Sequence, residues 1–229
     1  MKLAIIFDLD GTLIDTPQGI IETFTAALNS MGVVGNDALA IRATIGIPLE
    51  QAFSSLLGVD QNDDQVTYGI KQYQALFKDI VLPKAEKLIF PGVERGLKIL
   101  KAQGFALAVA TSKVYNSAEA LLKAAGLWEH FNLVVGADQV TRPKPHPEMG
   151  QLIMKKLSIL AEHSVMVGDT THDIFLAKNS GMRSIAVTYG VHDVEKLKSA
   201  KPTWIVDTFD EMLSHAFTIK QHSMKQNNY

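Results

Sequence analysis

The sequence predicts an α/β fold, with a parallel sheet covered by helices on both faces and an all-helical unit inserted after the first strand. Short segments that are apolar throughout recur along the chain, and segments with helical spacing of apolar residues alternate with them. This alternation is typical of a parallel sheet whose strands are buried on both faces. The insert is predicted because residues 16–84 contain no convincing strand.

The uninterrupted apolar segments are the candidate strands. A strand covered on both faces is apolar at every position, whereas a half-exposed strand alternates apolar and polar residues. The first candidate, residues 3–7, runs directly into Asp8 and is followed by Gly11. The later candidates are residues 105–110, 133–135, 165–167, 184–187 and 204–206.

Helices are expected between these strands and throughout the insert. Three segments with helical spacing each end at a glycine that can form a left-handed C-cap: 93–103, 115–125 and 171–180. In the insert, Thr16 before Pro17 is typical of a capped helix start. Apolar residues repeat at helical spacing after it, and further helical stretches follow at 36–44, 48–57 and 61–81.

These patterns divide the chain into three parts. Residues 1–15 and 85–220 are expected to form a Rossmann-like catalytic core. Residues 16–84 are expected to form a helical cap domain. The polar residues 221–229 are expected to be a flexible tail.

Composition excludes several classes of protein. The 229 residues are 47% hydrophobic and 20% charged, which is close to the globular average and argues against disorder. The formal net charge of -2 lacks the basic excess of a nucleic-acid-binding protein, and the absence of cysteine excludes disulfides and thiolate chemistry. No apolar run is long enough for a membrane span or a signal peptide. We therefore expect a cytoplasmic protein that binds neither nucleic acid nor membranes.

Two acids follow the first predicted strand. Asp8 and Asp10 are two residues apart, so at strand spacing their carboxylates point the same way. They lie beyond the carboxyl end of a parallel strand, where open α/β sheets bind ligands. Clustered carboxylates repel one another unless a cation lies between them, and Mg²⁺ prefers oxygen ligands. Taken alone, this pair fits an acidic turn at least as well as a metal site.

A second pair of acids strengthens the metal-site hypothesis. Asp169 follows the candidate strand 165–167, and Asp173 lies four residues later, in the first turn of the next helix. Residues four apart on a helix share a face, so the two carboxylates can lie on the same side. An acid at this position also stabilises the helix dipole. Four acids at the ends of two strands nevertheless predict a metal cluster.

Two further strand ends carry residues suited to phosphate. Thr111 and Ser112 follow the candidate strand 105–110, and a hydroxyl with backbone amides at a strand–helix junction is a common anion cradle. Lys144 lies between two prolines, which stiffen its backbone. A fixed ammonium fits a bound phosphate or a crowded acid cluster. The ordinary alternatives are a helix cap and a solvated loop lysine.

With these motifs in this order, the sequence resembles the haloacid dehalogenase superfamily over essentially its whole length. The matching motifs are Asp8-Leu9-Asp10-Gly11-Thr12, then Thr111-Ser112, then Lys144, then Gly168-Asp169 with Asp173. The presence of an acid at Asp10 makes the chain similar to the phosphatases of the superfamily, because the dehalogenases themselves lack an acid at this position. The segments 90–93 and 142–148 look most like the phosphoglycolate phosphatase branch and its pyrophosphatase relatives.

The resemblance implies Mg²⁺-dependent hydrolysis of a small phosphate monoester. Asp8 would be the nucleophile that forms an aspartyl-phosphate. Asp10 would protonate the leaving alcohol and then activate water. A helical insert after the first motif resembles the family's cap, which would select the organic part of a small phosphorylated metabolite.

The resemblance also implies a ligand set. Mg²⁺ would be bound by Asp8, by the backbone carbonyl of Asp10 and by Asp169, with Asp173 acting from the second coordination shell or through water. The phosphoryl oxygens would be held by Thr111, the Ser112 amide and Lys144. The sequence leaves open whether the protein is a monomer or a homodimer, because no exposed apolar stripe stands out.

Several alternatives stay open. A sugar phosphomutase of the β-phosphoglucomutase type shares all four motifs, although its cap uses a histidine and the segment 16–84 contains none. An inorganic pyrophosphatase on the same fold also fits. Three further alternatives are disfavoured. A phosphonoacetaldehyde hydrolase needs a buried lysine in the cap, and a receiver domain lacks a large helical insert. A non-catalytic binding protein is disfavoured because all four motifs are intact.

Arg42 is the candidate specificity residue of the cap. It precedes Gly46 in a loop between two predicted helices. A guanidinium there could pair with a substrate carboxylate or with a second phosphate. An ordinary surface arginine is an equally good interpretation of the sequence.

Overall fold

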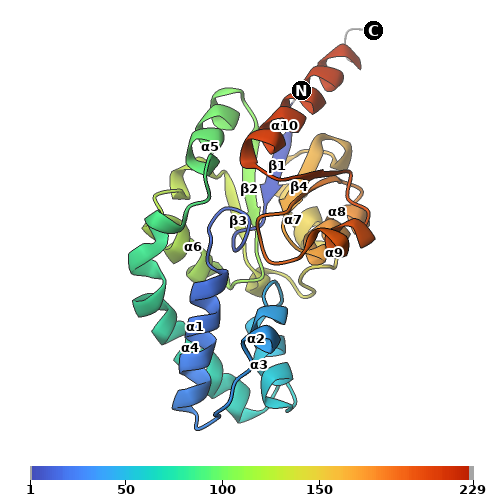
Figure 1. Ribbon diagram of the computed structural model, residues 1–229. Helices are drawn as coiled ribbons and strands as arrows, with labels where there is room; N and C mark the ends of the chain where they lie inside the picture. Colours follow the sequence, from blue (N-terminus) through green and yellow to red (C-terminus); the bar gives the residue numbers. More distant parts are fainter. Residues whose placement is uncertain (1, 227–229) are drawn as a thin grey trace.

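The computed structural model describes residues 2–226, and side chains as far as residue 221. Its centre is a six-stranded, fully parallel sheet with the strand order β3-β2-β1-β4-β5-β6 (Figure 1). The predicted α/β class and Rossmann-like parallel sheet are confirmed. The strands are β1 (Ala4–Phe7), β2 (Ala106–Ala110), β3 (Leu133–Val135), β4 (Ser164–Gly168), β5 (Arg183–Val187) and β6 (Trp204–Val206).

Helices follow the strands and fill the insert. The α-helices are α1 (Pro17–Ser30), α2 (Ala38–Ala43), α3 (Leu49–Leu57), α4 (Asp64–Ile80), α5 (Val93–Ala102), α6 (Tyr115–Ala124), α7 (Glu148–Leu157), α8 (Thr171–Asn179), α9 (Val194–Ser199) and α10 (Phe209–Gln226). The 3-10 helices are η1 (Leu82–Leu88), η2 (Trp128–His130), η3 (Ala137–Gln139) and η4 (Ala161–His163).

Strand β1 lies at the point where the strand order reverses. The chain passes from β1 to β2 and β3 on one side, and then returns to β4 on the other side of β1. Phe7 pairs with Val109 of β2 and with Val167 of β4, and the Asp8 amide donates to the Val167 carbonyl at 2.9 Å. The carboxyl ends of β1 and β4 are therefore neighbours at a topological switch point, where such sheets bind ligands.

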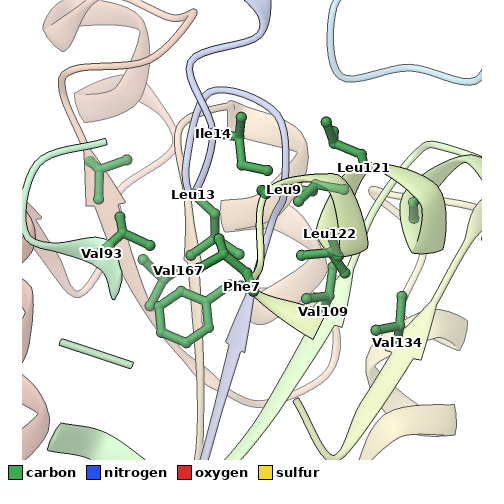
Figure 2. Close-up of a cluster of buried hydrophobic side chains, with 14 of the residues drawn as sticks. Phe7, Leu9, Leu13, Ile14, Val93, Val109, Leu121, Leu122, Val134 and Val167 are labelled. Carbon is green, nitrogen blue, oxygen red and sulfur yellow. The ribbon is translucent and has the colours of Figure 1, made fainter. Parts of the chain in front are cut away.

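Alternate residues of β1 face opposite layers of core. Phe7 belongs to the layer under α5, α6 and α10, and Figure 2 shows it among Val93, Val109, Leu122 and Val167. Ile6 belongs to the layer under α7 and α8, with Met149 and Met166. Both layers are buried, which explains why β1 is apolar at every position.

The four helices α1–α4 form a group of their own at one end of the sheet (Figure 1). Aromatic rings hold them together: the Phe24 ring centroid lies 4.9 Å from that of Phe53 and 4.6 Å from that of Tyr73. Tyr73 in turn packs against Phe77, with centroids 5.8 Å apart. The aromatic side chains of the insert thus build its core, and the expected boundary after residue 84 falls inside η1.

Helix α10 extends further than the sequence suggests. It continues through Gln226, so residues 221–226 are helical rather than part of an irregular tail, and residues 227–229 lie outside the described residues. Once Phe209 to Ile219 are packed on the core, each added residue gains a helical hydrogen bond at low cost. Within residues 2–226, none of the helices is both long and apolar enough to cross a membrane.

Candidate active site

Three buried carboxylates meet at the switch point of the sheet. Asp8 follows β1, Asp169 follows β4, and Asp173 lies in the first turn of α8. Each offers a carboxylate oxygen, and these oxygens all lie within 4.8 Å of one another. Their side chains come together because β1 and β4 are adjacent parallel strands with matched register.

Two glycines allow the backbone to approach this cluster closely. Gly11 has φ +78°, and a Cβ atom there would lie 2.3 Å from Asp169 Oδ2. A Cβ atom at Gly190 would also lie 2.3 Å from the Asp169 side chain. Any larger residue at either position would push Asp169 away, so the glycine of the first motif is needed for space as well as for the turn.

Lys144 supplies the ammonium of the cluster. Its Nζ lies 2.9 Å from Asp8 Oδ1 and 2.7 Å from Asp173 Oδ1, with the side chain fully buried. Burial alone would lower the pKa of this ammonium, but the charges of Asp173 and Asp8 outweigh burial and raise the pKa above its usual value. Lys144 is therefore a permanent cation that partly neutralises the acids.

Asp169 is held from two directions. The Thr12 hydroxyl donates to its Oδ1 at 2.7 Å, and the Val191 amide donates to its Oδ2 at 2.8 Å. Burial and the neighbouring charge of Asp173 nevertheless raise the pKa of Asp169 to about 7. Burial also raises the pKa of Asp8 well above its usual value, and the charge of Lys144 only partly opposes that shift. Negative charge in the cluster is therefore incompletely compensated.

This imbalance is the observation that fits a bound cation. Three carboxylates face one ammonium, and both Asp8 and Asp169 hold their protons more tightly than free carboxyl groups do. A buried charge is costly unless it is paired or bound to metal. All three ligand groups offer oxygen atoms, which suit a hard divalent cation.

Asp10 is placed differently from the other acids. Its carboxylate lies outside the three-carboxylate cluster, where it accepts a hydrogen bond from the Thr16 hydroxyl at 2.5 Å and pairs with Lys113 Nζ at 3.2 Å. The predicted use of Thr16 as a side-chain helix cap is wrong, because its hydroxyl is committed to Asp10.

Sequence reasoning missed Lys113 as a site residue. It directly follows Thr111 and Ser112 in the chain, and that position in the motif was the only available signal. Its ammonium also lies 4.3 Å from the centroid of the Phe77 ring, so it joins Asp10 of the core to α4 of the insert.

A cavity of about 400 Å³ lies between the carboxyl edge of the sheet and the insert. Asp8, Asp10, Thr111 and Ser112 line it from the core, whereas Lys144 and Asp169 do not reach its wall. Thr111 is buried, and the Ser112 hydroxyl donates to the Gly46 carbonyl of the insert at 2.7 Å. The two acids of the first motif thus share one cavity with the predicted phosphate-binding residues.

Arg42 is not at this cavity. Its guanidinium donates to the backbone carbonyls of Gly190 at 3.3 Å and Val191 at 3.2 Å, on the loop that also supports Asp169. The specificity role of Arg42 stays a prediction, and in this structure its donors are directed to the core backbone rather than to the cavity. Arg42 instead anchors the insert to the core.

Comparison with known proteins assigns the chain to a family. Residues 5–187 match the family model described as haloacid dehalogenase-like hydrolase, a range that covers the insert and strands β1 to β5. The chain belongs to this family. It is an enzyme of a hydrolase family, and the resemblance stated from its motifs is confirmed.

Relatives in this family share the full length of the chain. A "Probable phosphatase IndB" of Dickeya dadantii is 53% identical over all of both chains. A "Phosphoglycolate phosphatase" of Colwellia psychrerythraea is 31% identical over 93% of this chain and 96% of its own length. The crystal structure of a "predicted phosphatase" from Clostridium acetobutylicum, 29% identical, superposes with a TM-score of 0.82 over 95% of this chain and 100% of that one.

Proposed function

We propose that this enzyme hydrolyses a small phosphate monoester with the help of Mg²⁺, through an aspartyl-phosphate on Asp8. One observation carries the proposal. Asp8 Oδ1 accepts hydrogen bonds from the Leu9 amide at 2.7 Å and from Lys144, while its Oδ2 accepts none from the described residues. Asp8 also lines the cavity, so a carboxylate with one anchored oxygen and one free oxygen faces the space where substrate binds.

The chain's own residues account for both steps. Asp8 Oδ2 attacks phosphorus, the bond between phosphorus and the ester oxygen breaks, and protonated Asp10 gives its proton to that oxygen. Asp10 then takes a proton from water, whose oxygen attacks the same phosphorus. The bond between phosphorus and Asp8 breaks, and inorganic phosphate leaves with Asp8 and Asp10 restored. Thr16 and Lys113 hold Asp10 at the cavity wall for both transfers.

The cation would be held by Asp8, Asp169 and Asp173, together with the backbone carbonyl of Asp10 that the family resemblance implies. When bound, Mg²⁺ supplies charge that offsets the phosphoryl oxygens as an anionic nucleophile approaches them. Asp173 lies within 4.8 Å of Asp8 and Asp169, but its Oδ1 is paired with Lys144 and its Oδ2 accepts from the Thr170 amide and hydroxyl, which supports a role through water or from the second coordination shell.

The phosphoryl oxygens would be held by Thr111, by the Ser112 amide and by the positive charge of Lys144. Thr111 and Ser112 share the cavity wall with Asp8, which supports this assignment. Lys144 is buried and paired with Asp8, so its charge would act mainly by opposing the rise in the pKa of Asp8 that burial causes and by holding that carboxylate in place. Hydrolysis is favoured over phosphoryl transfer between sugar hydroxyls, because residues 16–84 hold no histidine to manage the transferred proton.

The experiment is phosphate release from p-nitrophenyl phosphate with and without Mg²⁺, by wild-type protein and by the Asp8→Asn variant. We expect release that requires both Mg²⁺ and Asp8. Asp15→Asn is the matched control, because Asp15 is a nearby exposed acid outside the cavity. Equal release by the wild type and Asp8→Asn would remove the nucleophile assignment.

A further inference from the structure

The cavity above Asp8 has walls of a particular chemistry. This inference rests on the proposed function and names its substrate class. We propose that the organic part of the substrate is an uncharged ring-bearing group, aromatic or heteroaromatic, rather than a second anion such as a carboxylate or a further phosphate.

Most of the wall contributed by the insert is apolar. It is formed by side chains from α1, α3, α4 and the loop between α2 and α3: Ile20, Phe24, Ile45, Ile47, Leu49 and Phe77. Flat and branched apolar surfaces on several sides of a cavity favour a flat apolar occupant, which gains burial and ring contacts there.

The described part of the cavity wall lacks a buried, unpaired cation that could bind a second anionic group of the substrate. Among the described residues that line the cavity, none is arginine or histidine, and the two lysines are Lys78 and Lys113. Lys113 is already paired with Asp10, and its ammonium lies over the Phe77 ring. Lys78 is exposed, so its ammonium is solvated. An anion buried among these walls would lose its hydration and gain at most a solvent-screened contact with Lys78, which is a poor exchange.

Neutral polar groups are present in the same wall. The side chains of Tyr73 and Gln74 line the cavity and make no hydrogen bond to the described part of the chain. Burial raises the pKa of the Tyr73 phenol well above its usual value, so the hydroxyl stays neutral and can donate or accept. These groups suit a ring that carries uncharged hydrogen-bonding atoms.

The size of the cavity and the contacts that close it favour the same class of substrate, one with an uncharged ring. A volume of about 400 Å³ falls within the range of small-molecule pockets, and a two-carbon acid would leave most of it unfilled. The contacts of Ser112 with Gly46 and of Arg42 with Gly190 and Val191 hold the insert against the core. The apolar wall is therefore held close to the reacting phosphate.

Binding of phosphonates, which cannot be hydrolysed, tests the inference independently of catalysis. Calorimetry in Mg²⁺ would compare 3-phenylpropylphosphonate with propylphosphonate and with phosphonoacetate. We expect the phenyl compound to bind about tenfold or more tightly than either, because its ring removes apolar surface from water. Equal binding of the phenyl and propyl compounds, or tighter binding of phosphonoacetate, would overturn the inference even if the protein hydrolyses p-nitrophenyl phosphate.

Turnover separates this inference from the proposed function. Initial rates would be measured with 2-phenylethyl phosphate, ethyl phosphate, 2-phosphoglycolate and pyrophosphate. A kcat/KM highest for 2-phenylethyl phosphate supports both proposals, and one highest for phosphoglycolate or pyrophosphate keeps the phosphatase but overturns the ring preference. If none of these esters nor p-nitrophenyl phosphate is hydrolysed, the proposed function fails, and phosphonate binding alone decides the cavity's ligand class.

Two adjacent residues of α1 provide a matched pair of variants. Ile20 lines the cavity, whereas Ile21 does not and is partly buried in the core of the insert. We expect Ile20→Ala to weaken binding of 3-phenylpropylphosphonate by about threefold or more and to leave propylphosphonate unchanged. Ile21→Ala should leave the ratio of the two affinities at the wild-type value. Equal ratios in the two variants would contradict the assignment of Ile20 to the ring site.

Discussion

The carboxyl edge of the sheet and the helical insert form opposite walls of one cavity, and they differ in almost every physical respect. At the edge, charged groups are buried and joined to one another, as Lys144 is to Asp8 and Asp173. Across the cavity the insert presents mostly apolar side chains with a few neutral polar groups, and its one lining lysine, Lys78, is exposed. This contrast underlies both proposals: the edge would carry out the chemistry, and the insert would recognise an uncharged group.

The difference also explains which wall carries motifs. Reaction chemistry needs particular residue types at strand ends, so its residues recur as short patterns such as Asp-x-Asp. An apolar wall needs only shape and hydrophobicity, which many residue types supply from several helices. Variants at the edge should therefore change rate and charge balance, and variants in the insert should change which compound binds.

Replacing Asp10 by Asn should have the largest effect. The variant lacks the proposed general acid for the leaving oxygen, so kcat/KM for 2-phenylethyl phosphate should fall by about 10²–10⁴. The kcat/KM for p-nitrophenyl phosphate should fall less, because p-nitrophenolate leaves in the first step without needing a proton. Rapid mixing should then show a burst of nitrophenolate close to one equivalent of enzyme. An equal fall in kcat/KM for the two esters would contradict the role of Asp10 as a general acid.

Replacing Lys144 by Met should have the next largest effect, on stability. Removing one partner of a buried ion pair typically costs about 3–5 kcal/mol, because the remaining charges are left uncompensated. The free energy of unfolding would be measured by urea titration of metal-free protein. Lys98→Met is the control: Lys98 pairs with Glu94 on the exposed surface of α5, and its loss should leave the free energy of unfolding almost unchanged. A similar cost for both variants would contradict the buried network.

The acid cluster should also give the metal-free protein a distinctive pH dependence. The pKa of Asp169 is about 7 in the folded protein against an ordinary value of 3.8, so between these pH values the folded state binds a proton that the unfolded state lacks. The contribution of Asp169 to stability is therefore fully present below pH 3.8 and is lost as the pH rises through 7.

Asp169→Asn isolates this contribution. In the presence of a chelator, its Tm should exceed that of the wild type at pH 8, and the gap should shrink as the pH falls toward 4. Added Mg²⁺ should stabilise the wild type more than the variant, since binding to the folded state raises stability. A gap that does not change with pH would refute the charge imbalance at Asp169.

Replacing Arg42 by Ala should have the smallest effect, and a revealing one. The variant loses the hydrogen bonds to Gly190 and Val191 that hold the insert against the core. We expect kcat/KM to fall by about three- to tenfold for all esters, since two hydrogen bonds from a charged group are lost. The ratio between 2-phenylethyl phosphate and 2-phosphoglycolate should stay at the wild-type value. A change in that ratio would return Arg42 to the role of a specificity residue.

The sequence by itself determined the fold class and most of the residues that gather at the edge of the sheet. Uninterrupted apolar segments predicted all six strands of the sheet. The adjacency of parallel strand ends predicted a cluster of four acids, of which Asp8, Asp169 and Asp173 meet and Asp10 lies apart. Helices ending at glycine were found at α5, α6 and α8, whereas α7, α9 and the full length of α10 were not. These predictions succeed because strand periodicity, end residues and motif spacing are local properties of the chain.

Only the tertiary structure decided which groups face the cavity. The Arg42 guanidinium donates to the backbone of residues 190–191, and the Thr16 hydroxyl donates to Asp10 instead of capping α1. The Lys113 ammonium pairs with Asp10 and lies over the Phe77 ring. The apolar character of the cavity likewise arises from four segments of the insert brought together around the edge. The physical reason is that helix packing sets the direction of each long side chain, and residue spacing along one segment does not encode that packing.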